Sequence, residues 1–235
     1  MSAFMGEFIG TALLIIMGDG VVANVVLNKT KGNNSGWIVI TFGWAMAVFM
    51  GVYISNKLGG GGHLNPAVTI ALAAFKDFEA SLILPYIAGQ LAGAFTGAII
   101  VWLSYKQHFD ATEDKDLKLA VFCTGPAIRS TPFNLLTEIV GAAVLMFAAL
   151  AISPSATSMG TLDALPVALV VLGIGLSLGG PTGYAINPAR DLGPRIAHFI
   201  LPIKNKKDSD WGYSWIPVVG PIAGALLAAW LFSFL

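Results

Sequence analysis

Long apolar stretches separated by short polar connections run through the whole chain. A helix that crosses a bilayer needs roughly 20 mostly apolar residues. Six stretches approach or reach that length, at 4–27, 37–56, 81–105, 133–153, 163–180 and 213–235. Two shorter apolar segments, 66–75 and 188–201, each begin at or directly after an Asn-Pro pair and are too short to cross alone. The pattern predicts an all-α membrane protein with six transmembrane helices and two re-entrant half-helices.

Composition supports a membrane location. Of the 235 residues, 56% are hydrophobic and only 11% are charged, whereas soluble proteins average about 25% charged residues. The formal net charge is zero and no basic stripe is present, so nucleic acid is not an expected partner. Cys123 is the single cysteine, which excludes an intramolecular disulfide. The first residues lack the positive region of a cleaved signal peptide, so we expect the first apolar run to be retained as a span.

The two halves of the chain are related in sequence. Glu138 follows Glu7 at a distance of 131 residues, and the same shift places "GPIAGA" (220–225) on "GQLAGA" (89–94). A polar stretch at 104–118 separates the halves. Each half has three spans and one half-span, and because three is odd the second copy enters the membrane from the opposite face. We therefore expect one channel domain, 1–235, built from two inverted repeats at about 1–125 and 130–235.

An Asn-Pro-Ala triplet precedes each half-span. Asn is a favoured N-cap residue and Pro a favoured first helical residue, so each triplet predicts a helix start. Two helix N-termini that face each other at the membrane midplane repel protons and cations, while the Asn amides can still donate to a neutral solute. The triplets are Asn65, Pro66 and Ala67, and Asn187, Pro188 and Ala189.

Non-helical backbone at membrane depth is tolerated only where it lines a cavity. The segments that lead into the two triplets are therefore expected to present their carbonyl groups to a pore. The expected pore-lining backbone comprises Gly61, Gly62, His63 and Leu64 in the first half, and Pro181, Thr182 and Gly183 in the second.

The motifs "HLNPAVTIAL" and "AINPARDLGP", together with the paired Glu7 and Glu138, resemble the aquaporin family over essentially the whole chain. Asp191 after the second triplet resembles the glycerol-facilitator branch, particularly its bacterial members. The resemblance implies a passive channel in a bacterial plasma membrane that is not an enzyme and needs no cofactor or metal. It also implies a homotetramer, with lipid and small neutral solutes such as glycerol and water as its partners. Glu7, Glu138 and Asp191 would be buried structural acids, the first two accepting hydrogen bonds from the non-helical segments.

Four residues match the family's narrowest point. They are Trp44, Gly175, Tyr184 and Arg190, with Phe42 as a weaker contender for the first position. Two aromatic rings would face the CH groups of a polyol, and the guanidinium would donate to its hydroxyl groups. Water-selective relatives usually carry His where this chain has Gly175, so the glycine favours a wider solute such as glycerol.

Several alternatives remain open from the sequence. The main solute could instead be protonated lactic acid, dihydroxyacetone, urea, hydrogen peroxide or water. A proton-coupled secondary transporter is a rival because inverted repeats with broken helices also build transporters, and its coupling group would be Glu7, Glu138 or Asp19. Asp19 has no assigned role, nor does the run Gly60–Gly62, where the family usually has Ser-Gly-Ala.

The orientation is contested as well. The family places both termini in the cytoplasm, which leaves the connections at 28–36, 106–132 and 181–212 outside. These connections hold eleven of the thirteen Lys and Arg residues. The positive-inside rule favours the reverse orientation.

Overall fold

The computed structural model describes residues 2–75, 78–152, 158 and 160–235, and the regular elements of these residues are all helical. The first half contains α1 (Ala3–Val26), α2 (Trp37–Lys57), α3 (Pro66–Phe75) and α4 (Ala80–Ser104). The second half contains α7 (Thr131–Ile152), a 3-10 turn (Gly160–Leu162), α8 (Leu165–Leu178), α9 (Pro188–Ile200) and α10 (Ile216–Phe232). In both halves a short helix that begins at the Pro of a triplet stands before the last long helix.

The polar connection between the halves contains two helices that the hydrophobic pattern does not predict. They are α5 (Lys106–Ala111) and α6 (Lys115–Phe122). Asp114 starts α6, because its side chain accepts hydrogen bonds from the backbone N–H groups of Asp116 and Leu117.

Among the residues that the structure describes, four helices are long and apolar enough to cross a membrane, namely α1, α2, α4 and α7. The other two predicted spans are shorter than expected, since α8 has 14 residues and α10 has 17. The end of the predicted span 133–153 lies outside the described residues. The α10 helix begins late because residues 211–215 form turns.

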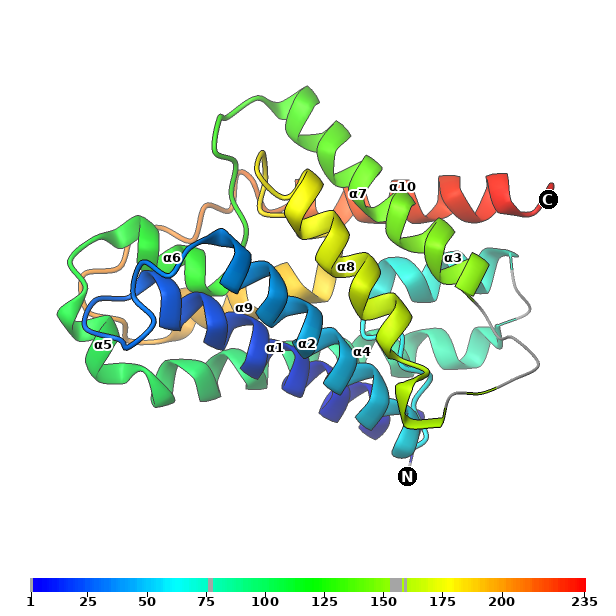
Figure 1. Cartoon of the computed structure of the whole chain (residues 1–235), viewed down its shortest axis with the longest axis horizontal. Helices are drawn as coiled ribbons and strands as arrows, with labels where there is room; N and C mark the ends of the chain where they lie inside the picture. Colours follow the sequence, from blue (N-terminus) through cyan, green and yellow to red (C-terminus); the bar gives the residue numbers. More distant parts are fainter. Residues whose placement is uncertain (1, 76–77, 153–157, 159) are drawn as a thin grey trace.

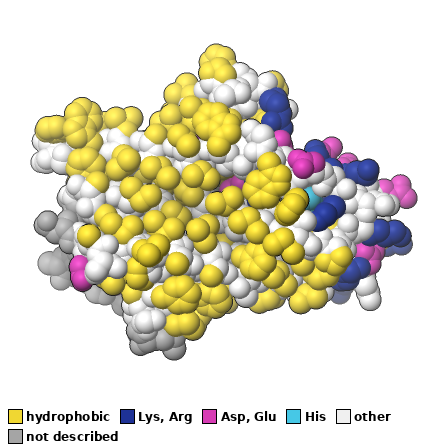
Figure 2. Space-filling view, turned by 180° about the vertical axis from the view of Figure 1, so that it is seen from behind, with side chains coloured by type: hydrophobic (Ala, Val, Ile, Leu, Met, Phe, Trp, Pro, Cys, Tyr) yellow, Lys and Arg dark blue, Asp and Glu magenta, His cyan; other side chains and the backbone are white. Residues whose placement is uncertain are grey.

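The half-helices pack against long helices of the other half of the chain as well as their own. The α3 helix contacts α10, and α9 contacts α4, while α2 contacts α8. Both termini lie at one end of the molecule, and α5 and α6 lie at the opposite end (Figure 1). Apolar side chains cover the body of the molecule in Figure 2, and charged side chains gather at the end that holds α5 and α6.

Glycines allow the closest helix pairs to form. On α4, a Cβ added at Gly93 would overlap the carbonyl oxygen of Phe8 on α1. On α10, a Cβ added at Gly224 would overlap the carbonyl oxygen of Ile139 on α7. These two contacts are related by the same shift that relates Glu7 to Glu138. Small residues at such crossings let helix backbones approach in lipid, and here the same contact occurs once in each half of the chain.

Candidate functional site

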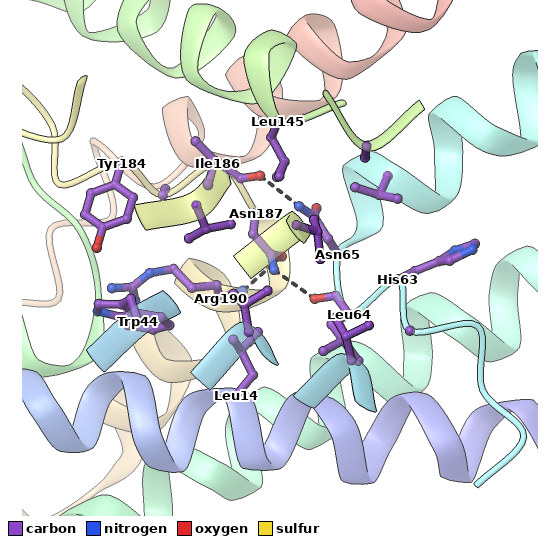
Figure 3. A pocket seen from close by; sticks show the side chains of 18 residues that line it. Leu14, Trp44, His63, Leu64, Asn65, Leu145, Tyr184, Ile186, Asn187 and Arg190 are labelled. Atoms are coloured by element: carbon purple, nitrogen blue, oxygen red, sulfur yellow. Dashed lines mark hydrogen bonds between the residues drawn. The ribbon is translucent and has the colours of Figure 1, made fainter. Parts of the chain in front are cut away.

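The two Asn-Pro-Ala triplets meet in the middle of the molecule. The side chain of each asparagine donates a hydrogen bond to the backbone carbonyl of the residue before the other asparagine. The Asn65 side-chain N–H donates to the Ile186 carbonyl at 2.8 Å, and that of Asn187 donates to the Leu64 carbonyl at 2.8 Å (Figure 3). The two links mirror each other. An Asn amide carries two N–H groups, and within the described residues each asparagine uses one of them in these links.

The side-chain oxygens of the same asparagines cap the half-helices. Oδ1 of Asn65 accepts the N–H of Ala67 at 2.9 Å, and Oδ1 of Asn187 accepts that of Ala189 at 3.0 Å. Each asparagine therefore has a fixed orientation, with its oxygen toward its own helix and its nitrogen toward the segment before the other asparagine.

The backbone before each asparagine repeats an unusual conformation. Leu64 and Ile186, one residue before the asparagines, have φ of 51° and 46°. Gly62 and Tyr184, three residues before them, have φ of 65° and 40°. Left-handed values are uncommon outside glycine, and here they recur at equal offsets although the residues differ. The conformation therefore belongs to the segment and not to one side chain.

Glu7 holds the first segment in place. It is fully buried and accepts backbone N–H groups from Gly61 at 3.2 Å, His63 at 3.1 Å and Leu64 at 2.7 Å. Ser55 and Gln90 donate to the same carboxylate from α2 and α4. A buried carboxylate is tolerated when donors surround it in this way.

Glu138 has the equivalent position in the second half. It accepts the Thr182 hydroxyl at 2.7 Å and the backbone N–H groups of Ala185 at 3.0 Å and Ile186 at 2.8 Å. The hydrogen bonds expected of both acids are thus present. Neither acid is among the residues that line the cavities described next.

Two cavities, of about 150 Å³ and about 260 Å³, meet at three shared residues: Trp44, Tyr184 and Arg190. The first cavity is largely apolar and includes both asparagines. The second lies toward Thr124 and Gly180. The guanidinium carbon of Arg190 is 3.9 Å from the Trp44 ring centroid, and Figure 3 shows the three side chains together at one side of the asparagines. These three residues form the boundary between the cavities.

Trp44 is held by a glycine that the sequence analysis did not single out. A Cβ added at Gly18 on α1 would overlap the Trp44 ring. Trp44 is only 4% exposed, whereas the weaker contender Phe42 is 53% exposed and lines neither cavity. The geometry therefore favours Trp44 at this position.

Gly175 is not among the residues that line either cavity, and it contacts the boundary through Tyr184. A Cβ there would be 2.8 Å from Cζ of Tyr184, and its carbonyl accepts the Trp37 indole N–H at 3.0 Å. Trp37 also packs edge-on against Tyr184, with ring centroids 5.9 Å apart, and lines the second cavity. Sequence reasoning missed Trp37, because only the fold brings α2 against α8.

The two cavities include part of the backbone that was expected to line a pore. Gly62, His63 and Leu64 line the first cavity, and Gly183 lines the second. Gly61, Pro181 and Thr182 line neither, although they were expected to. The Gly61 N–H turns to Glu7, the Thr182 hydroxyl turns to Glu138, and the Pro181 carbonyl accepts the Ala127 N–H at 2.9 Å. Ala185 and Ile186 line the first cavity in place of the earlier residues.

The run of glycines is explained by its neighbours. A Cβ at Gly60 would overlap the Ser55 hydroxyl, and a Cβ at Gly61 would be 2.7 Å from the Tyr86 hydroxyl. Gly62 has a left-handed backbone, with a φ of 65°. The Ser-Gly-Ala that the family usually has here would need both Ser55 and the Gly62 backbone to adjust.

Asp191 joins α9 to the end of the molecule that carries the charged side chains. It accepts the Thr124 hydroxyl at 2.7 Å and the Arg195 Nε–H at 2.8 Å. Arg195 donates in turn to the carbonyls of Ser209 at 2.7 Å and Thr124 at 2.9 Å. Arg195 had no assigned role from sequence: only its ion pair with Asp191, four residues earlier on α9, is local, and its other partners, Ser209 and Thr124, lie in loops.

The His63 side chain is held by neighbouring side chains of its own half of the chain. Its Nδ1 is 3.0 Å from the Thr69 hydroxyl, and its ring lies against those of Phe78 and Tyr86. Among the described residues, no group of three or more His, Cys, Asp or Glu side chains is placed to hold a metal ion.

Comparison with known proteins gives one consistent result. The model of the major intrinsic protein family matches residues 1–232. A probable glycerol uptake facilitator protein of Thermotoga maritima is 58% identical over 235 residues, covering all of both chains. A D/L-lactic acid transporter of Lactiplantibacillus plantarum is 41% identical, covering 96% of this chain and 94% of that one. The crystal structure of the aquaglyceroporin from Plasmodium falciparum has a TM-score of 0.87 and 32% identity, covering 98% of this chain and 94% of that one.

Proposed function

Because the chain belongs to the major intrinsic protein family, we propose that it is a passive channel through which glycerol and similar small neutral solutes cross a bacterial plasma membrane. The observation that carries the proposal is the boundary formed by Trp44, Tyr184 and Arg190. Two aromatic rings offer apolar surface to the CH groups of a polyol, while the guanidinium offers N–H donors to its hydroxyl groups.

The asparagine pair supports the exclusion of ions. The N-termini of α3 and α9 carry partial positive charge, and each asparagine nitrogen has an N–H left for a solute oxygen. A proton or cation would face repulsion at this point. A neutral solute would be accepted by hydrogen bonds.

The rival functions have less support. A proton-coupled transporter needs an ionisable group in the solute path. Glu7 and Glu138 accept backbone N–H groups from the re-entrant segments of their own halves, and neither they nor Asp19 lines the two cavities. Lactic acid is carried by a relative of 41% identity, whereas the relative of 58% identity is named for glycerol. We therefore place lactic acid second, and we propose no catalytic reaction.

The assembly is proposed to be a homotetramer in which each subunit has its own pore. Large apolar side chains remain exposed along α7, including Phe133, Leu136, Val140 and Val144. Lipid or a neighbouring subunit would cover this face.

The test is solute flux into proteoliposomes that contain the purified protein, followed by light scattering after an osmotic shift. We expect glycerol to enter well above the rate of empty liposomes, without accumulation and without an effect of an uncoupler. A glycerol rate equal to that of empty liposomes would contradict the proposal. A panel of protonated lactic acid, urea, dihydroxyacetone and water in the same assay would rank the solutes.

A further inference from the structure

Asp19 lies directly behind the boundary of the two cavities. It follows Gly18, on which Trp44 packs, and it is completely buried. One of its carboxylate oxygens is 3.5 Å from Nη1 of Arg190. Within the part of the chain that the structure describes, neither oxygen of Asp19 accepts a hydrogen bond.

A buried carboxylate without hydrogen-bond donors is costly unless an opposite charge lies beside it. Arg190, itself only 7% exposed, is that charge. The nearby Asp191 is already occupied by Thr124 and Arg195. Asp19 is therefore the acid that compensates Arg190.

We infer that Asp19 is a positioning residue that makes the boundary selective for neutral solutes over anions, by orienting Arg190 and cancelling its charge. The inference rests on the proposed function, since it gives Asp19 a role in the same solute path.

The contacts of Arg190 show how the orientation would be fixed. Nη1 is directed to the Phe122 carbonyl at 3.4 Å and to Asp19, while the plane of the guanidinium lies near the Trp44 ring. In the described residues, Nε and Nη2 donate to no protein acceptor. With Nη1 held back by Asp19, these groups form the edge that faces a passing hydroxyl group.

The charge argument concerns anions. An unpaired arginine repels cations but attracts anions, and the N-termini of α3 and α9 add positive potential to the same path. Pairing with Asp19 removes the net side-chain charge at the boundary. Anions then gain little by entering, and a neutral polyol still finds its donors.

The test compares the wild type with Asp19→Asn, a change that keeps the shape of the side chain and removes its charge. Glycerol flux is measured as above, and nitrate flux is measured with potassium nitrate and valinomycin, which carries the balancing cation. Nitrate has no neutral form that could cross the lipid. We expect the ratio of nitrate to glycerol permeability to rise about tenfold, the order expected for a unit charge roughly 10 Å from the ion at an effective dielectric constant of about 20.

The matched control is Asp110→Asn, which removes one negative charge from an exposed ion pair with Lys106 on α5. We expect the ratio of nitrate to glycerol permeability in this variant to equal that of the wild type. An unchanged ratio in folded Asp19→Asn would overturn the inference. Absence of glycerol flux in the wild type would instead count against the proposed function.

A stability measurement covers the case in which Asp19→Asn folds but is too unstable for flux to be measured. Arg190→Gln leaves Asp19 unpaired, and the double variant removes both charges. If the two residues compensate each other, the double variant unfolds at a higher temperature than either single variant and shows no gain in nitrate flux. A double variant that is less stable than both singles would overturn the inference.

Discussion

At the scale of single residues, the boundary between the cavities depends on side chains that lie behind it. Trp44 rests on Gly18, Tyr184 rests on Gly175, and Arg190 faces Asp19. The three boundary residues could be proposed from the sequence only through its resemblance to the aquaporin family, by alignment to the Asn-Pro-Ala motifs. Their supports could not, because Gly18 and Trp44 are brought together only when α1 packs against α2.

Gly175 provides the first residue-level prediction. In Gly175→Ala the new Cβ would be 2.8 Å from the Tyr184 ring. Such overpacking typically lowers the free energy of unfolding by about 1–3 kcal/mol. Tyr184 is expected to move toward the path, so glycerol flux should fall several-fold while water flux falls less. Gly175→His should lower glycerol flux further, because its side chain is larger.

Gly173 offers a matched control on the same helix. A Cβ added there meets no described atom within 4 Å. Gly173→Ala should therefore leave the ratio of glycerol to water flux unchanged. Equal ratios in Gly175→Ala and the wild type would show that Tyr184 is not supported in this way.

At the scale of elements, the sequence was most informative where a local rule decides the outcome. The starts of α3 and α9 follow from the Asn-Pro pairs, and the long apolar runs locate α1, α2, α4 and α7. The polar stretch that forms α5 and α6 has no apolar period long enough to reveal helices of six and eight residues. Their contacts with the rest of the chain could not be predicted from the sequence either. One example is the Asn28 side-chain N–H, which donates to the Ala111 backbone carbonyl.

The related glycines of the two halves give an element-level prediction. In Gly224→Ala the added Cβ would overlap the Ile139 carbonyl, and in Gly93→Ala it would overlap the Phe8 carbonyl. Gly224→Ala should push α10 away from α7, and Gly93→Ala should push α4 away from α1. Each change should lower the free energy of unfolding by about 1–3 kcal/mol. We expect a lower unfolding temperature in detergent for both variants, by similar amounts because the contacts are equivalent. Gly20→Ala, which meets no described atom within 4 Å, should unfold close to the wild type.

At the scale of the whole molecule, the charged end is tied together by its own contacts. Lys206 donates to the carbonyls of His198, Phe199 and Leu201, which end α9, and partial burial lowers its pKa. Lys118 donates to the Lys204 carbonyl, and Arg129 pairs with Asp210. Much of the positive charge at this end thus serves the folded structure, which weakens its value as a marker of the cytoplasmic side. Counting Lys and Arg residues in the connections could not show that these side chains have protein partners, since most of the partners are remote along the chain.

Because the charge count carries less weight, we follow the orientation that the family resemblance implies and predict that both termini lie inside the cell and the charged end outside. The native Cys123 is buried at 3% exposure, so a cysteine introduced elsewhere would be the main reactive thiol. In intact cells, a membrane-impermeant maleimide should label Asn205→Cys at the charged end and should label Ser2→Cys only after the cells are opened. Labelling of Ser2→Cys alone in intact cells would show the orientation that the positive-inside rule favours, and the second cavity would then open toward the cytoplasm.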